Sequence, residues 1–170
     1  MKLLWIAVIG LLATTASTTA FGQRVPLDDS MSPQQSFTVD LQWAPQHVEQ
    51  ALGAMLADQD TPLPPLTGYI PGIEIRLDTS RYVGRRGRIF MSVPIVIAGD
   101  TSAGALEIDW QARGAFLAGS MRPGQEALIF EGLLDARLLS GTFDFVISMA
   151  SSSELDTFSL ELRYELEIID

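Results

Sequence analysis

The feature that most constrains the fold is a strict two-residue alternation of apolar and polar side chains near the end of the chain. From Phe158 to Ile168, apolar residues occupy every second position, and the residues between them are Ser, Glu and Arg. Successive side chains of a β-strand point to opposite faces, so this pattern predicts a strand with one face on a core and the other in water. Such one-sided burial is typical of antiparallel sheets.

The same period recurs along much of the chain. Alternating segments begin at Ile73, Arg88, Leu106 and Phe143, and turns containing Gly or Pro separate them. Short strands with turn signals about every ten residues are typical of two packed antiparallel sheets. We therefore expect residues 36–170 to form one all-β domain, a two-sheet antiparallel sandwich that is immunoglobulin-like in its layering. A closed barrel is the alternative.

Two segments depart from the two-residue period. Pro45–Asp58 places its large apolar residues at helical spacing, which predicts one short amphipathic helix near residues 45–58. The residues on that expected apolar face are Val48, Leu52, Met55 and Leu56. Gln59–Gly72 contains four prolines and is expected to be an irregular loop.

The first residues predict export. One Lys precedes an apolar run from Leu3 to Ala13, and small residues follow, which is the layout of a signal peptide over residues 1–22. Cleavage is expected after Ala20 or after Gly22. The polar residues 23–35 are expected to form a flexible lead-in. The exported chain would then be periplasmic or extracellular, and it would not span a membrane after the signal is removed.

Composition excludes several kinds of chemistry. The only Lys lies in the leader, so ten Arg face 21 acidic residues in the rest of the chain, which argues against a nucleic-acid partner. Cys is absent, and His47 is the only histidine. Disulfides, thiolate catalysis and zinc sites built on His or Cys are therefore excluded. No other motif predicts a cofactor, a metal or a catalytic constellation.

The strongest local feature is a concentration of arginine between residues 76 and 88, where five of the ten arginines lie. Guanidinium groups bind carboxylates and phosphates in two-point geometry, and neighbouring aromatic rings can stack on a ligand. We read the segment as a hairpin that contacts an envelope protein or an anionic surface glycan; the alternative is a solvated loop paired with surface carboxylates. The expected contact residues are Arg76, Arg81, Tyr82, Arg85, Arg86, Arg88 and Phe90.

Three functions remain open at this point. The first is a non-enzymatic envelope protein that has a binding or structural role. The second is a carbohydrate-binding or carbohydrate-processing domain that uses Tyr82, Phe90 or Trp110 for stacking, with Glu107 and Asp109 nearby. The third is a fibre or pilus-type subunit that assembles by strand exchange, with the last strand at a sheet edge.

Overall fold

The computed structural model describes residues 24–34, 36–56, 63–94, 106–150 and 157–169. Nearly all regular structure in these residues is antiparallel β-strand, with one α-helix and two short 3-10 turns. The elements are β1 (Arg24–Pro26), β2 (Ser36–Asp40), β3 (Gln42–Trp43), η1 (Pro45–His47), α1 (Val48–Leu56), β4 (Leu66–Asp78), η2 (Ser80–Tyr82), β5 (Arg86–Ser92), β6 (Leu106–Gly114), β7 (Gly119–Met121), β8 (Glu126–Leu133), β9 (Leu138–Met149), β10 (Thr157–Glu161) and β11 (Arg163–Ile168).

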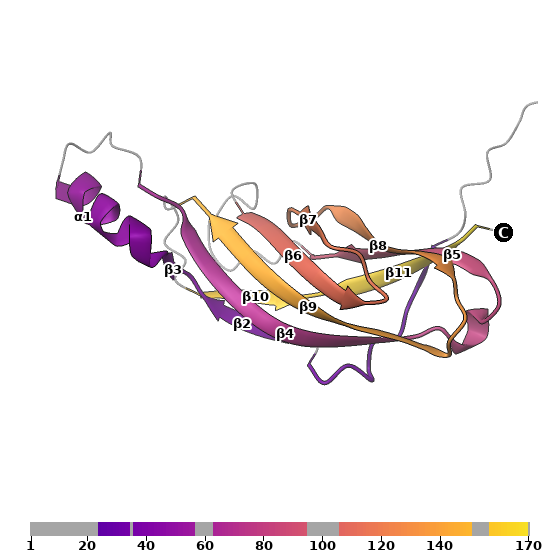
Figure 1. Ribbon diagram of the computed structural model, residues 1–170. Coiled ribbons are helices and arrows are strands. Elements are labelled where there is room, and N and C mark those ends of the chain that lie inside the picture. Colours follow the sequence, from indigo (N-terminus) through magenta and orange to yellow (C-terminus); the bar gives the residue numbers. More distant parts are fainter. Residues whose placement is uncertain (1–23, 35, 57–62, 95–105, 151–156, 170) are drawn as a thin grey trace, which may run out of the picture.

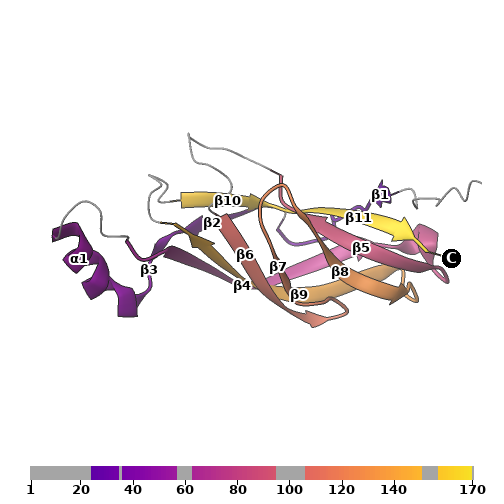
Figure 2. The same cartoon turned by 90° about the horizontal axis from the view of Figure 1, so that it is seen from above.

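The strands form two facing layers, which confirms the predicted all-β sandwich. One layer is a five-stranded sheet in the order β3-β4-β9-β6-β7. The other contains a four-stranded sheet in the order β1-β11-β5-β8, and β10, which leads directly into β11, pairs with β2. Figures 1 and 2 show an elongated molecule with α1 beyond one end of the sheets and the β4–β5 connection at the other. The finer expectation of an immunoglobulin-like arrangement is not confirmed.

The core is built by the alternation that the sequence displays. In β9, Phe143, Phe145, Ile147 and Met149 are all buried, while the residues between them face outward or are half-buried. The rings of Phe143 and Phe145 stack with centroids 5.7 Å apart. Trp110 of β6 packs beside Phe145, and its indole N–H donates to a backbone carbonyl, so its polar atom is satisfied within the core.

The long alternating segment at the end of the chain forms two consecutive strands rather than one. β10 and β11 are separated at Leu162, and the apolar side chains from Leu160 to Leu166 are buried as expected. β11 pairs with β1 on one side and with β5 on the other. β11 is therefore an interior strand, whereas β10 pairs with β2 alone among the described strands.

The predicted short helix is present as α1, and its large apolar side chains face outward. Only Ala51 and Ala54 of α1 are buried, whereas the four large apolar residues are exposed. The reason is position, because α1 lies past the end of the two sheets (Figure 1) and no sheet surface is there to receive that face.

The expected loop at residues 59–72 is largely strand. β4 begins at Leu66 and runs through Pro71, where the pairing with β9 shifts register between Ile70 and Ile73. A β-bulge leaves a residue outside the ladder, so it tolerates a proline that has no N–H to donate. Gly72 takes the positive φ of 70° there. Residues 59–62 of the expected loop, and residues 57 and 58 of the expected helix, lie outside the described part.

The segment expected to be a flexible lead-in is instead part of the fold. β1 pairs with β11, and Leu27 is buried. The Ser32 hydroxyl accepts a hydrogen bond from the Arg76 N–H at 2.9 Å, and the Asp28 carbonyl accepts one from Asp78 N–H at 2.9 Å. Because β3 pairs with only the first two residues of β4, these contacts satisfy backbone groups farther along the same edge.

Gly141 of β9 sits where no larger residue fits. A Cβ there would lie 2.6 Å from the Arg113 carbonyl oxygen and 2.5 Å from the Phe116 ring. We predict that Gly141→Ala lowers the free energy of unfolding by about 1–3 kcal/mol, because the sheet must shift to admit the methyl group. The matched control is Gly53→Ala, where a Cβ meets nothing within 4 Å and helix propensity favours Ala by about 1 kcal/mol. Urea titration compares both; a Gly141→Ala protein as stable as the parent contradicts the packing described.

The buried hydroxyl of Tyr164 makes the free energy of unfolding depend on pH in the alkaline range. Burial raises the pKa of its hydroxyl well above 10.0, and the charge of Asp29 adds to the shift. The unfolded chain therefore releases this proton at a lower pH than the folded chain, so stability is lost as pH rises above about 10. We expect Tyr164→Phe to lose less unfolding free energy than the parent between about pH 9 and pH 11. Denaturant titrations of the parent and of Tyr164→Phe at the two pH values measure these losses. Equal losses of unfolding free energy in the two proteins would contradict the expected role of Tyr164.

Candidate functional site

The arginine-rich segment is a connection between the two layers and not a hairpin. β4 pairs with β3 and β9 in the five-stranded sheet, whereas β5 pairs with β11 and β8 in the other. The chain between them crosses from one layer to the other at the end of the sandwich opposite α1 (Figure 1). The expectation of a hairpin is therefore wrong, because β4 and β5 are neighbours in sequence but belong to different sheets.

The division separates Arg76 from Arg88. Arg76 points outward from β4 and forms an ion pair with Glu74 at 2.8 Å. Arg88 points outward from β5, in the opposite layer, and pairs with Glu131 at 3.0 Å. The hydrogen bond from Arg88 lowers the pKa of the Glu131 carboxyl. These two arginines belong to solvated sheet faces and do not share a binding surface.

The Phe90 ring is covered by Arg24, which is not among the contact residues expected from the sequence. The Arg24 guanidinium lies 3.9 Å from the centroid of the Phe90 ring, and Arg24 also forms an ion pair with Glu126. A cation over an aromatic face is a stabilising contact. Phe90 therefore helps to hold β1 against the sheet. No pattern in the sequence signals this contact, because Arg24 and Phe90 meet only through the pairing of β1, β11 and β5.

The remaining three arginines of the segment stay together, and another loop adds a fourth. Thr79 is fully buried; its N–H donates to the Arg137 carbonyl and its hydroxyl to the Ala136 carbonyl, at 2.9 and 2.8 Å. Gly84 N–H donates to the Leu134 carbonyl at 2.8 Å. These bonds fasten the β4–β5 connection to the β8–β9 connection, so two loops form one surface.

We call this surface the arginine end and define it by its exposed guanidinium residues. They are Arg81, Arg85, Arg86 and Arg137. Tyr82 is half-buried among them and packs against the core. Arg81, Arg85 and Arg86 are among the contact residues expected from the sequence. Arg137 is not, because nothing in the order of residues indicates that the two loops are bonded to each other.

A small hollow of about 170 Å³ adjoins Arg81, and its walls include Asp28 and Asp78. Hydrogen bonds from Ser30 and Ser80, respectively, lower the pKa of these carboxyls, and the Arg81 charge also lowers that of Asp78. Both are therefore charged at neutral pH. The hollow therefore holds two negative charges beside the positive charge of Arg81.

Two of the three rings expected to stack on a carbohydrate ligand are covered within the protein. Trp110 is only 1% exposed and belongs to the core, and Phe90 lies beneath Arg24. Glu107 and Asp109 are exposed on β6, as their alternation predicted. Within the described ranges, no three His, Cys, Asp or Glu residues come together as a group that could hold a metal ion.

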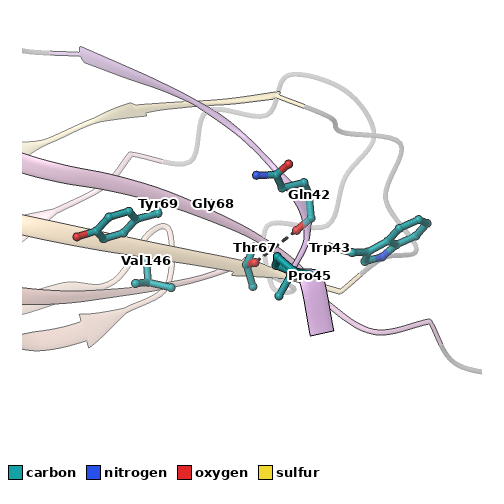
Figure 3. Close-up of a pocket in the computed structure, with 8 residues that line it drawn as sticks. Gln42, Trp43, Pro45, Thr67, Gly68, Tyr69 and Val146 are labelled. Atoms are coloured by element: carbon teal, nitrogen blue, oxygen red, sulfur yellow. Dashed lines mark hydrogen bonds between the residues drawn. The ribbon is translucent and has the colours of Figure 1, made fainter. Parts of the chain in front are cut away.

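A second hollow lies at the opposite end of the molecule, next to the base of α1. Its volume is about 280 Å³. In Figure 3, Tyr69 and Val146 lie side by side on β4 and β9, and the Thr67 hydroxyl donates to the Gln42 carbonyl at 3.4 Å. Trp43 and Pro45 complete this wall. No sequence pattern indicates this groove, because Tyr69 falls in the stretch that was expected to be a loop.

His47, the only histidine, lies beside this groove in η1. It is half-buried, and its Nδ1 atom is buried without a hydrogen-bond partner in the described part of the chain. It lies at the opposite end of the molecule from the arginine end (Figure 1). No helix within the described ranges has the length and apolar character needed to cross a membrane. Comparison with known proteins finds no family model, no characterised protein and no solved structure that matches the chain.

Proposed function

We propose that this chain is an exported, non-enzymatic binding domain of the cell envelope that docks an acidic face of another envelope protein through the arginine end. The observation that carries the proposal is the joining of two loops that bring Arg81, Arg85, Arg86 and Arg137 to one end of a chain with a net charge of −10. The leader-like residues 1–22 support export to the periplasm or the cell exterior.

Charge supports a contact at this end more than elsewhere on the surface. Four exposed guanidinium groups lie on the two joined loops, whereas most charged side chains of the protein are acidic. An acidic partner would be repelled by most of the protein and attracted at one end. Such a field orients the encounter and accelerates association, and Arg forks then bind carboxylates in two-point geometry.

Rigidity supports the same conclusion. The arginine end rests on Thr79, which is fully buried, and on Leu134, whose side chain is in the core. Reciprocal backbone bonds join Leu134 to Gly84 and Arg85. A binding surface on loops that are already fastened to each other loses little backbone entropy on association.

We predict that replacing Arg81, Arg85 and Arg137 by Ser removes the protein that cross-links to the chain in intact cells. The affinity for that partner is expected to fall by at least about tenfold, since exposed charge contacts with the acidic face are lost. The matched control replaces Arg113, Arg122 and Arg163 by Ser, which changes the net charge equally from exposed positions elsewhere.

The control variant is expected to keep its partner. Equal cross-linking by both variants, with both folded, would contradict the proposal. So would a chain that cross-links to no protein but is retained by a carboxylated polysaccharide, since the partner would then be an anionic surface glycan. A chain recovered from the cytoplasm with residues 1–22 still attached would remove the proposed compartment.

A further inference from the structure

We propose that a hollow between residues 26–29 and residues 161–165 binds the ammonium group of a small aliphatic amine. The hollow has a volume of about 360 Å³, which falls within the range of roughly 300–1,000 Å³ that is usual for small-molecule sites. The acidic side chains among its lining residues are Asp29, Glu161 and Glu165. None of the four residues of the arginine end lines this hollow, so the inference does not rest on the proposed function.

The chain that follows β1 runs from one layer to the other and carries Asp29 to the hollow. Leu27 N–H donates to the Tyr164 carbonyl at 2.9 Å, which attaches this segment to β11. Asp78 N–H donates to the Asp28 carbonyl at 2.9 Å, which attaches the next residue to β4. Asp29 follows directly and is half-buried. Its position is therefore fixed by the fold, so a ligand would lose little affinity to the cost of ordering it.

The hydroxyl of Tyr164 is the group that points to a ligand. Tyr164 is only 5% exposed, and it lines the hollow. Burial first, and then the charge of Asp29, raise the pKa of the hydroxyl, so the phenol oxygen and the Asp29 carboxylate are close in space. Among the described residues, no group donates a hydrogen bond to this hydroxyl or accepts one from it. A buried phenol normally has such a partner, and this one presents a free oxygen to the hollow.

The two carboxylates beside the hydroxyl are poorly neutralised. Burial raises the pKa of Asp29, and the negative charges of Asp28 and Glu161 raise it further. Asp29 forms no ion pair within the described part of the chain. Glu161 has Arg163 at 3.5 Å, but both side chains of that pair are more than half exposed, and exposed pairs are weak. A cation bound beside Asp29 would relieve the repulsion between these acidic groups.

The donors and acceptors favour an ammonium group over a metal ion. An ammonium group has three N–H donors, and the hollow offers the carboxylates of Asp29 and Glu161 and the hydroxyl of Tyr164. Calcium takes about six to eight oxygen ligands, and no three acidic or histidine side chains of the described ranges gather to hold a metal ion. Pro26 and Leu27 also line the hollow and suit the methylene chain of an aliphatic amine.

Calorimetric titration of the purified protein with putrescine tests the site. The parent is expected to bind with a dissociation constant below about 1 mM. Asp29→Asn and Tyr164→Phe are each expected to raise that constant by at least about fivefold, because one removes the charge and the other removes the hydroxyl. The matched control is Asp109→Asn, the same exchange at an exposed position of β6, and it is expected to bind like the parent. Glu161→Gln changes an exposed residue, so it weakens binding without a risk to folding.

Two further measurements make the test specific to this chemistry and this place. Tetramethylammonium carries the same charge but no N–H donor, and it is expected not to bind. The backbone amide resonances that shift with putrescine are expected to belong to residues 26–29 and 161–165. A parent without saturable binding up to roughly 10 mM putrescine would overturn the proposal. So would equal binding by the parent, Asp29→Asn and Glu161→Gln, shifts confined to other residues, or displacement of putrescine by an equal concentration of calcium.

Discussion

The pairing of β9 with both β4 and β6 organises the rest of the sandwich. β9 is twelve residues long, and the described register matches it with β4 from Leu66 to Asp78 and with β6 from Leu106 to Gly114. Its inward face carries the stacked rings of Phe143 and Phe145. Burying such side chains is the main favourable term in folding a domain that has no disulfide to constrain its unfolded state. The opposite layer supplies Ile89, Met91 and Leu166 to the same core.

The ends of this core explain where function can lie. At one end, the connections β4–β5 and β8–β9 are bonded to each other and present arginine. At the other end, the sheets stop, α1 projects beyond them, and its large apolar side chains remain uncovered. The two surfaces lie at opposite ends of an elongated molecule (Figure 1) and differ in chemistry.

Local periodicity made much of the fold predictable, because a half-buried strand must alternate. The burial of Phe37 and Val39 in β2, and of Ile89 and Met91 in β5, follows directly from sequence. The errors came from interactions that periodicity does not contain. Proline at position 71 suggested a loop, although a bulge accommodates it within β4. The polar residues before position 35 suggested disorder, although Ser32 bonds to the open edge of a strand.

The candidate site was predictable only in part, for a similar reason. Clustering in sequence selected Arg81, Arg85 and Arg86, which lie on one connection. It also selected Arg76 and Arg88, which a crossover between layers separates. The position of Arg137 beside the other arginines depends on hydrogen bonds between loops that are distant in sequence. The covering of Phe90 by Arg24 depends on the order of the strands in the sheet. Neither has a local signature.

Native-state hydrogen exchange, resolved residue by residue, tests the central role of β9 most directly. If β9 organises the sandwich, the amides of Ile147, Phe145 and Phe143 exchange only through global unfolding, with protection equal to the free energy of unfolding measured by denaturant. The amides of the short strands β1 and β7 exchange through smaller openings. Protection of β9 that is lower than that of β1 or β7 would contradict the account.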